Sequence, residues 1–351
     1  MVALATFFTR LLITYVIGAV GGFLYTWLHL PLPWILGPVT SLLIYKLFPI
    51  ARTTASLRLR KVSFSILGIQ IGSTFTAATL TTVVPYLVPY TVLTLLLIAL
   101  SLGSAYLITR WVKLDITTSL LGSIPGGLST VLALSESFNG NTVLVTIFQT
   151  IRLVAVLFII PFSATHLFFH QTQLTQGAVQ QQAVNGPTWT ILLFIAAFLI
   201  GLLLQRWVPA SLVLIPMLVT AALQINGIAL FQLPNSAYLF AQLTIGVYLG
   251  NSISVKDLKT AGKYCLYFLC LAILLIATSF LFGFLFSSFT NLNTATAVLS
   301  LAPGGLIEMA LTAQSVNGDP SIVSSLQMIR LLTIVLILPF FLKWLFKKLQ
   351  S

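Results

Sequence analysis

Apolar stretches of about 20 residues recur along the whole chain, and each is long enough as a helix to span the ~30 Å hydrocarbon core of a bilayer. In the first half the pattern predicts helices near residues 11–29, 32–50, 62–80 and 84–109, a segment broken by glycine and proline at 115–137, and a long helix at 142–169. In the second half it predicts the same series at 188–206, 210–230, 238–254, 264–287, 293–315 and 320–346. The expected fold class is an all-α polytopic membrane protein.

An internal duplication relates the two series of helices. Residues 125–162 and 303–340 align without a gap, at a constant offset of 178, and 15 of their 38 positions are identical. The same offset relates Gly68 and Gly72 to Gly246 and Gly250, and Pro31 and Pro38 to Pro209 and Pro216. The sequence therefore predicts a first membrane repeat at 1–170, a polar linker at 171–187 and a second membrane repeat at 188–351.

Composition agrees with a membrane protein and excludes most soluble classes. Hydrophobic residues make up 58% of the chain and charged residues 6%, too few to cover a soluble protein of this size. A net charge of +12 could indicate nucleic acid or lipid, but the basic residues fall in short loops and no large soluble segment remains. Expected partners are the lipid bilayer, a small solute and a coupling ion (H⁺ or Na⁺), with a homodimer left open; no nucleic acid and no cofactor are expected.

The distribution of Lys and Arg distinguishes two topologies. If every segment crossed the membrane, each repeat would have six crossings and several basic residues would lie outside. If each broken segment enters and leaves on one side, each repeat has five crossings and the repeats are inverted. That arrangement places 15 of the 17 basic residues on the cytoplasmic side, as the positive-inside rule requires. The favoured interpretation is two inverted repeats, each of about five transmembrane helices plus a re-entrant segment, in the cytoplasmic (inner) membrane with both termini cytoplasmic; a crossing segment stays open.

The breaks in the two re-entrant segments are candidate binding elements. They consist of Pro125, Gly126 and Gly127 in the first repeat, and Pro303, Gly304 and Gly305 in the second. A short helix is expected to begin after each break, at Leu128 and Leu306, and its free N–H groups and positive dipole end would favour an anion. The alternative is a glycine notch for close helix packing, which is also the favoured interpretation of Gly68-x-x-x-Gly72 and Gly246-x-x-x-Gly250.

Two arginines are expected near mid-membrane, and each follows a glutamine by three residues on one helix face. The pairs are Gln149 with Arg152 and Gln327 with Arg330. A charge at the bilayer centre costs at least ~2.5 kcal/mol and so indicates function by default. The arginines could bind an anionic solute, or they could pair with a buried carboxylate or cap backbone carbonyls.

Glu308 is the acidic residue nearest a break, three residues after Gly305. A carboxyl group buried at that depth could carry a proton or could neutralise an arginine. Glu136 near the first break is a weaker candidate for the same role. No catalytic residue and no metal site is predicted.

The paired Pro-Gly-Gly segments and the Arg-containing helices that follow them resemble the AbrB-type duplicated membrane proteins of bacteria, over nearly the full chain. That family shares only a name with the soluble DNA-binding regulator. The resemblance implies a fold similar to that of cation/proton antiporters and anion transporters, and members carry labels such as ammonia monooxygenase or regulator of gene expression.

The monooxygenase label finds no support in the residues, because a copper or iron site needs several His or carboxylate ligands and the chain has three His. The leading hypothesis is a secondary transporter of a small, anionic solute that works by alternating access. The alternative is a membrane sensor or regulator of gene expression.

Overall fold

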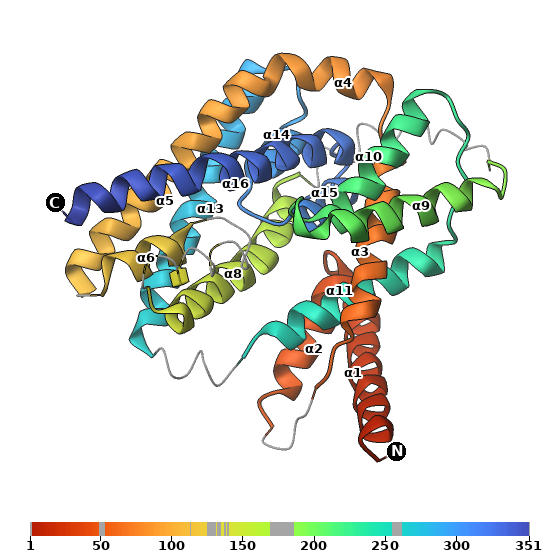
Figure 1. Ribbon diagram of the computed structural model, residues 1–351, viewed down its shortest axis with the longest axis horizontal. Coiled ribbons are helices and arrows are strands. Elements are labelled where there is room, and N and C mark those ends of the chain that lie inside the picture. Colours follow the sequence, from red (N-terminus) through yellow and green to blue (C-terminus); the bar gives the residue numbers. More distant parts are fainter. Residues whose placement is uncertain are drawn as a thin grey trace. The chain divides into compact units, whose positions relative to one another are not determined.

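A computed structural model describes residues 2–48, 53–112, 114–124, 131, 135–136, 138, 140–168, 186–254 and 262–350. Within these residues the regular structure is helical and contains no strand, so the all-α prediction is confirmed (Figure 1). The first half comprises α1 (Val2–Trp27), α2 (Pro33–Tyr45), α3 (Leu57–Gly72), α4 (Ala77–Val83), η1 (Val84–Tyr86), α5 (Leu87–Val112), α6 (Ile116–Ser123) and α8 (Thr142–Phe168). The second half comprises α9 (Thr190–Leu203), η3 (Leu204–Arg206), α10 (Ser211–Ile225), α11 (Asn235–Ser252), α13 (Lys263–Phe289), α14 (Thr294–Leu301), α15 (Leu306–Ser315) and α16 (Pro320–Gln350).

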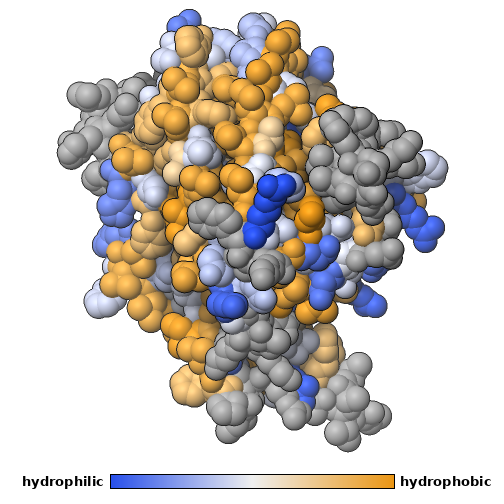
Figure 2. Space-filling view, turned by 90° about the vertical axis from the view of Figure 1, so that its left-hand side faces the viewer, coloured by the Kyte–Doolittle hydropathy of each residue, from blue (hydrophilic) through white to orange (hydrophobic). Residues whose placement is uncertain are grey.

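Five described segments are long and apolar enough to cross a membrane: Phe7–Trp27, Ala77–Arg110, Thr142–Phe168, Lys263–Phe289 and Pro320–Ile337. Large hydrophobic side chains also lie on the molecular surface. Trp27 on α1, Val88 on α5 and Leu203 on α9 are 77%, 74% and 77% exposed, and hydrophobic residues cover much of the face in Figure 2. A surface of this kind is favourable in lipid and unfavourable in water. The helices therefore indicate a membrane-embedded protein.

One predicted helix was wrong. The sequence pattern predicted a single helix over 62–80, whereas α3 ends at Gly72 and α4 begins at Ala77. The Thr76 hydroxyl accepts a bond from the Thr79 amide at 3.3 Å, and the Thr79 hydroxyl accepts one from the Thr76 amide at 3.1 Å. This reciprocal capping stabilises a new helix start. Hydrophobicity alone could not reveal it, since the residues on both sides of the break are apolar.

The chain forms two compact units. Unit 1 comprises Met1–Thr81, Thr165–Val255 and Gln314–Ser321, and unit 2 comprises Thr82–Ala164, Lys256–Ala313 and Ile322–Ser351. Each unit therefore combines segments from both predicted repeats. The linker predicted at 171–187 lies outside the described residues except at its end, Gly186 and Pro187.

Inside unit 1, helices of the first half pack against helices of the second half. On α3, a Cβ atom added to Gly68 would lie 2.5 Å from the carbonyl oxygen of Val213 on α10. On α11, a Cβ added to Gly246 would lie 2.6 Å from the carbonyl oxygen of Ile35 on α2. The offset of 178 converts one contact into the other, because it relates Gly68 to Gly246 and Ile35 to Val213. Glycine lets the paired backbones approach this closely, as the small-xxx-small motif predicted.

Helices α2 and α10, which pack against these glycines, both begin after a residue with a left-handed backbone. The N-cap residues Leu32 of α2 and Ala210 of α10 stand at the 178 offset, and both have left-handed backbones, with φ of 46° and 53°. Such a φ is uncommon for a residue other than glycine. Its occurrence at both equivalent positions shows that the two halves share a detailed local geometry as well as a sequence pattern.

Lys46 in the first half is a charged residue whose equivalent in the second half is neutral. Lys46, at the C-cap of α2, donates from its ammonium group to the carbonyl oxygens of Gly250, Asn251 and Ile253 at 3.0, 2.7 and 2.8 Å. It thereby caps the C-terminus of α11, where a cation is stabilising. Burial lowers the pKa of Lys46 to about 8. The residue at the 178 offset is Gln224, which is neutral and exposed.

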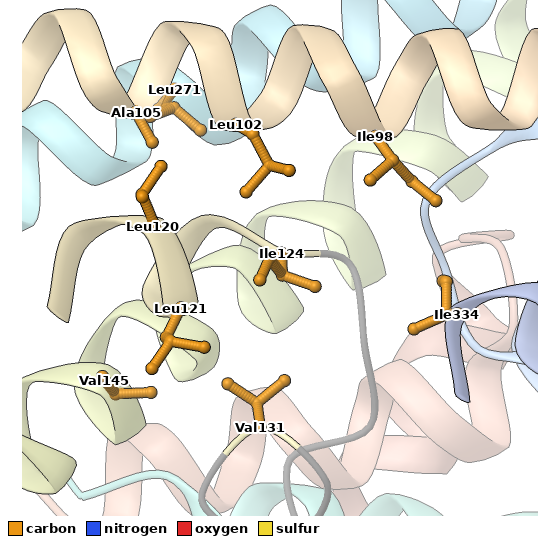
Figure 3. Packing of buried hydrophobic residues seen from close by; sticks show 10 residues of the cluster. All are labelled: Ile98, Leu102, Ala105, Leu120, Leu121, Ile124, Val131, Val145, Leu271 and Ile334. Carbon is orange, nitrogen blue, oxygen red and sulfur yellow. The ribbon is translucent and has the colours of Figure 1, made fainter. Parts of the chain in front are cut away.

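Unit 2 has an apolar core around the broken segments. Ile98 and Leu102 of α5 point toward Leu120 of α6 and toward Ile124, the residue that follows α6 (Figure 3). The rest of this cluster comes from several helices: Ala105, Leu121, Val131, Val145, Leu271 and Ile334. Burial of this apolar surface holds α6 against its neighbours and fixes where its C-terminal end lies.

Candidate functional site

The second broken segment lies between α14 and α15. Helix α14 ends at Leu301, and Ala302 leaves the helix with φ −58° and ψ 135°. Pro303 has no backbone N–H to donate, and the extended backbone of Ala302 before it ends α14. Helix α15 begins at Leu306, as predicted. The interruption leaves the carbonyl groups at the end of α14 without helical partners, and these groups are buried.

Gln327 of α16 supplies most of the missing donors. Its side-chain amide nitrogen lies 2.9, 3.0 and 3.0 Å from the carbonyl oxygens of Leu299, Ser300 and Ala302. The side chain is 1% exposed. Its amide oxygen is buried and has no hydrogen-bond partner. A single glutamine thus holds the end of α14 in place.

Arg330 lies one turn farther along α16 and supplies further hydrogen-bond donors to the carbonyl groups at the break. Its guanidinium group donates to the carbonyl oxygens of Ala302 and Gly304. The side chain is 9% exposed. Of the two structural roles that the sequence left open for this arginine, carbonyl capping is the one observed. The guanidinium group nevertheless places a positive charge directly at the break, so an anionic ligand there would be attracted.

The first broken segment has the same arrangement at the offset of 178. Helix α6 has the bounds of α14 shifted by that offset. The side-chain nitrogen of Gln149 lies 2.9, 3.3 and 3.0 Å from the carbonyl oxygens of Leu121, Gly122 and Ile124, and Arg152 donates to Ile124. Pro125, Gly126 and Gly127 lie outside the described residues, as does Leu128, where a helix was predicted to begin.

The two breaks differ in polarity. At the second, the Tyr90 hydroxyl on α5 donates to the Ser300 carbonyl at 3.0 Å, and the ring is fully buried. The residue equivalent to Tyr90 is Phe268, which instead stacks on Phe148 with ring centroids 3.5 Å apart. Tyr90 was not among the predicted site residues. Its signal was a phenol in an otherwise apolar span, where buried hydroxyl groups normally need a partner.

Glu308 stands in the first turn of α15, where the helix dipole stabilises a carboxylate. The side chain is half-buried, and it folds back toward the start of its own helix. A Cβ added to Gly305 would lie 2.0 Å from one Glu308 carboxyl oxygen, so only glycine leaves room for this conformation. Glu136 is exposed.

At the second break, Tyr90, Gln327 and Arg330 therefore donate hydrogen bonds to backbone carbonyls, and Glu308 stands in the first turn of the helix that follows. Among the residues that the structure describes, no group of three or more His, Cys, Asp or Glu side chains could hold a metal ion. The chemistry available at the break is hydrogen bonding, charge attraction and proton transfer.

Comparison with known proteins adds a family and two relatives. The family model described as "Transition state regulatory protein AbrB" matches residues 34–346. "Uncharacterized protein YhjN" of Bacillus subtilis (strain 168) is 28% identical over 290 residues, which cover 78% of this chain and 75% of that protein. "Putative regulator AbrB" of Escherichia coli (strain K12) is 29% identical over 327 residues, which cover 88% of each chain. No solved structure matches the chain.

Proposed function

The chain belongs to the AbrB family, and on that premise we propose that it is a secondary transporter of a small, anionic solute. The proposal rests on one observation. The ends of α6 and α14, one from each half, receive hydrogen bonds from a Gln-Arg pair at the same offset. Irregular backbone at membrane depth is tolerated only where protein buries it or where it lines a cavity. Interrupted helices in duplicated halves are typical of transporter binding sites near the midplane.

The charge at the breaks supports an anionic solute. Arg152 and Arg330 place two guanidinium groups there, against one nearby carboxyl group on Glu308. An organic carboxylate or an inorganic oxyanion could accept hydrogen bonds from guanidinium N–H groups. The substrate-binding set therefore comprises the residues of both breaks and both pairs: Pro125, Gly126, Gly127, Gln149, Arg152, Pro303, Gly304, Gly305, Glu308, Gln327 and Arg330.

Purified full-length protein in liposomes tests the proposal. The assay measures uptake of labelled succinate, glutamate, lactate, phosphate and sulfate into vesicles loaded with the same unlabelled anion. We expect saturable uptake of at least one anion by the wild-type protein and a loss of that uptake in Arg330→Lys, because lysine keeps the charge but lacks the planar fork of donors. Arg206→Lys on the exposed turn η3 is the matched control and should transport normally.

A membrane sensor or regulator is the second candidate, and the printed name of the Escherichia coli relative favours it. A sensor would bind one of the tested anions, raise the unfolding temperature and give no flux. A transporter would bind the anion and would also give flux. Flux therefore decides between the two functions, and the complete absence of both binding and flux with all five anions contradicts the anionic solute.

The inverted arrangement of the repeats makes a prediction about the linker. The contacts between the halves in unit 1 support a two-fold relation between them, and the distribution of Lys and Arg places both termini in the cytoplasm. A single cysteine introduced at Gln176, with Cys265 and Cys270 changed to serine, should react with a membrane-impermeant maleimide added to the outside of intact cells. Reaction only after the cells are opened contradicts this orientation and the five-crossing repeats with it.

A further inference from the structure

We propose that the carboxyl group of Glu308 is the binding site of the coupling proton, and that its protonation frees the N-terminus of α15 for the anionic substrate. The inference rests on the proposed function and deepens it. A carboxylate of the protein itself now lies at the helix start where a substrate anion would bind. Two anions cannot share that position without strong repulsion, so one must leave or be neutralised.

Glu308 has no basic partner among the residues that the structure describes. Within the described part of the chain, no ion pair joins its carboxyl group to a lysine or an arginine. The groups nearest the break on neighbouring elements are Arg330 on α16 and Tyr90 on α5, and both donate to backbone carbonyls instead. Neutralisation of an arginine, one of the two roles left open by the sequence, is therefore not what Glu308 does.

The oxygen atoms around the break favour a proton over a sodium ion. A sodium ion would need several oxygen ligands around it. Four carbonyl oxygens around the break already accept hydrogen bonds, namely those of Leu299, Ser300, Ala302 and Gly304. A proton needs only the carboxyl group itself. A lone carboxyl group beside occupied carbonyls is thus suited to H⁺ rather than to a metal ion.

The position of Glu308 decides whether a proton can reach its carboxyl group. Gly305 is exposed and Glu308 is half-buried, so the carboxyl group lies beside an open part of the surface. A Cβ atom added to Gly305 would lie 2.0 Å from one carboxyl oxygen of Glu308, so this oxygen lies beside an exposed residue. A proton could therefore reach the carboxyl group from the surface beside Gly305.

A purely structural role makes a different prediction. Glutamate at the third position of a helix can cap the start of its own helix, and glutamine does this equally well. Glu308→Gln should therefore preserve a cap while removing the proton site. If capping were the whole role, Glu308→Gln would transport the anion with the same pH dependence and the same proton coupling as the wild-type protein.

Infrared difference spectroscopy between acid and neutral pH reads the protonation directly and needs no substrate. The chain has only five acidic residues, so the carboxyl background is small. We expect Glu308→Gln to lose one carboxyl protonation signal, Glu308→Asp to retain a shifted one, and Glu136→Gln to keep the Glu308 signal because Glu136 is exposed and separate. An unchanged carboxyl spectrum in Glu308→Gln, with folding verified by thermal unfolding, overturns the proton site.

Vesicles loaded with a pH-sensitive dye test the coupling. An inward gradient of the transported anion should acidify the lumen with the wild-type protein and not with Glu308→Gln, and labelled anion measured in the same vesicles separates a loss of coupling from a loss of transport. Acidification by Glu308→Gln at the wild-type rate overturns the inference. Absence of anion flux in the wild-type protein contradicts the proposed function instead, and the infrared result still decides whether Glu308 binds a proton.

Discussion

Arg330→Met is expected to lower the free energy of unfolding by about 2–4 kcal/mol, because it removes two charge-assisted hydrogen bonds from buried carbonyls. The carbonyl of Ala302 would keep its bond from Gln327, whereas that of Gly304 would lose the one donor described for it. Methionine fills a similar volume, so the change tests the bonds rather than a cavity. Chemical unfolding of detergent-solubilised protein, followed by tryptophan fluorescence, measures the loss.

Two further variants show whether the effect belongs to the break. Arg206→Met removes an exposed arginine of η3 and should leave stability unchanged. Arg152→Met removes the equivalent contact at the first break and should also destabilise the protein. Wild-type stability in both Arg152→Met and Arg330→Met would mean that neither guanidinium group holds its break, and the carbonyl-capping account would be wrong.

Gly68→Leu and Gly246→Leu are expected to destabilise the protein by about 3 kcal/mol or more each, because the new Cβ atoms would collide with backbone carbonyls that cannot move aside. Both substitutions act at the helix contacts between the halves in unit 1, so their effects should be similar. Size-exclusion chromatography and thermal unfolding of the purified variants measure the loss of folded protein.

Gly103→Leu is the matched control. Gly103 lies on α5, and a Cβ added there meets nothing within 4 Å. This variant should fold like the wild-type protein, which removes the general effect of leucine in a membrane helix from the comparison. If one of the two glycines of unit 1 tolerates leucine and the other does not, the equivalence of the two contacts is contradicted.

Much of the fold followed from the sequence, because hydrophobic length and glycine-proline breaks are local signals. The predicted start of a helix at Leu306, directly after the second break, agrees with the start of α15. The family resemblance is confirmed by the family match. The break between α3 and α4 was missed because Thr76 and Thr79 cap a helix inside a continuously apolar stretch.

The candidate site was predicted only in outline. Gln327 and Arg330 stood out as polar residues in an apolar span, but sequence could not choose between a ligand and a backbone carbonyl as their partner. The sequence also could not predict which helices of the two halves pack against each other in unit 1. A glycine motif shows that a helix has a close neighbour, and Gly68 would look the same whether α2 or α10 filled that place.

This packing between the halves has a consequence for biosynthesis. The glycine surface of α3 finds its partner only after the ribosome has produced Val213, near the start of the second half. Until then the newly inserted α3 has a backbone notch that lipid chains or an insertase must cover. Premature termination after the first half would leave α2 and α3 permanently without α11 and α10. Such a fragment should be a substrate for membrane quality-control proteases, whereas the two halves expressed together as separate polypeptides could still complete each other.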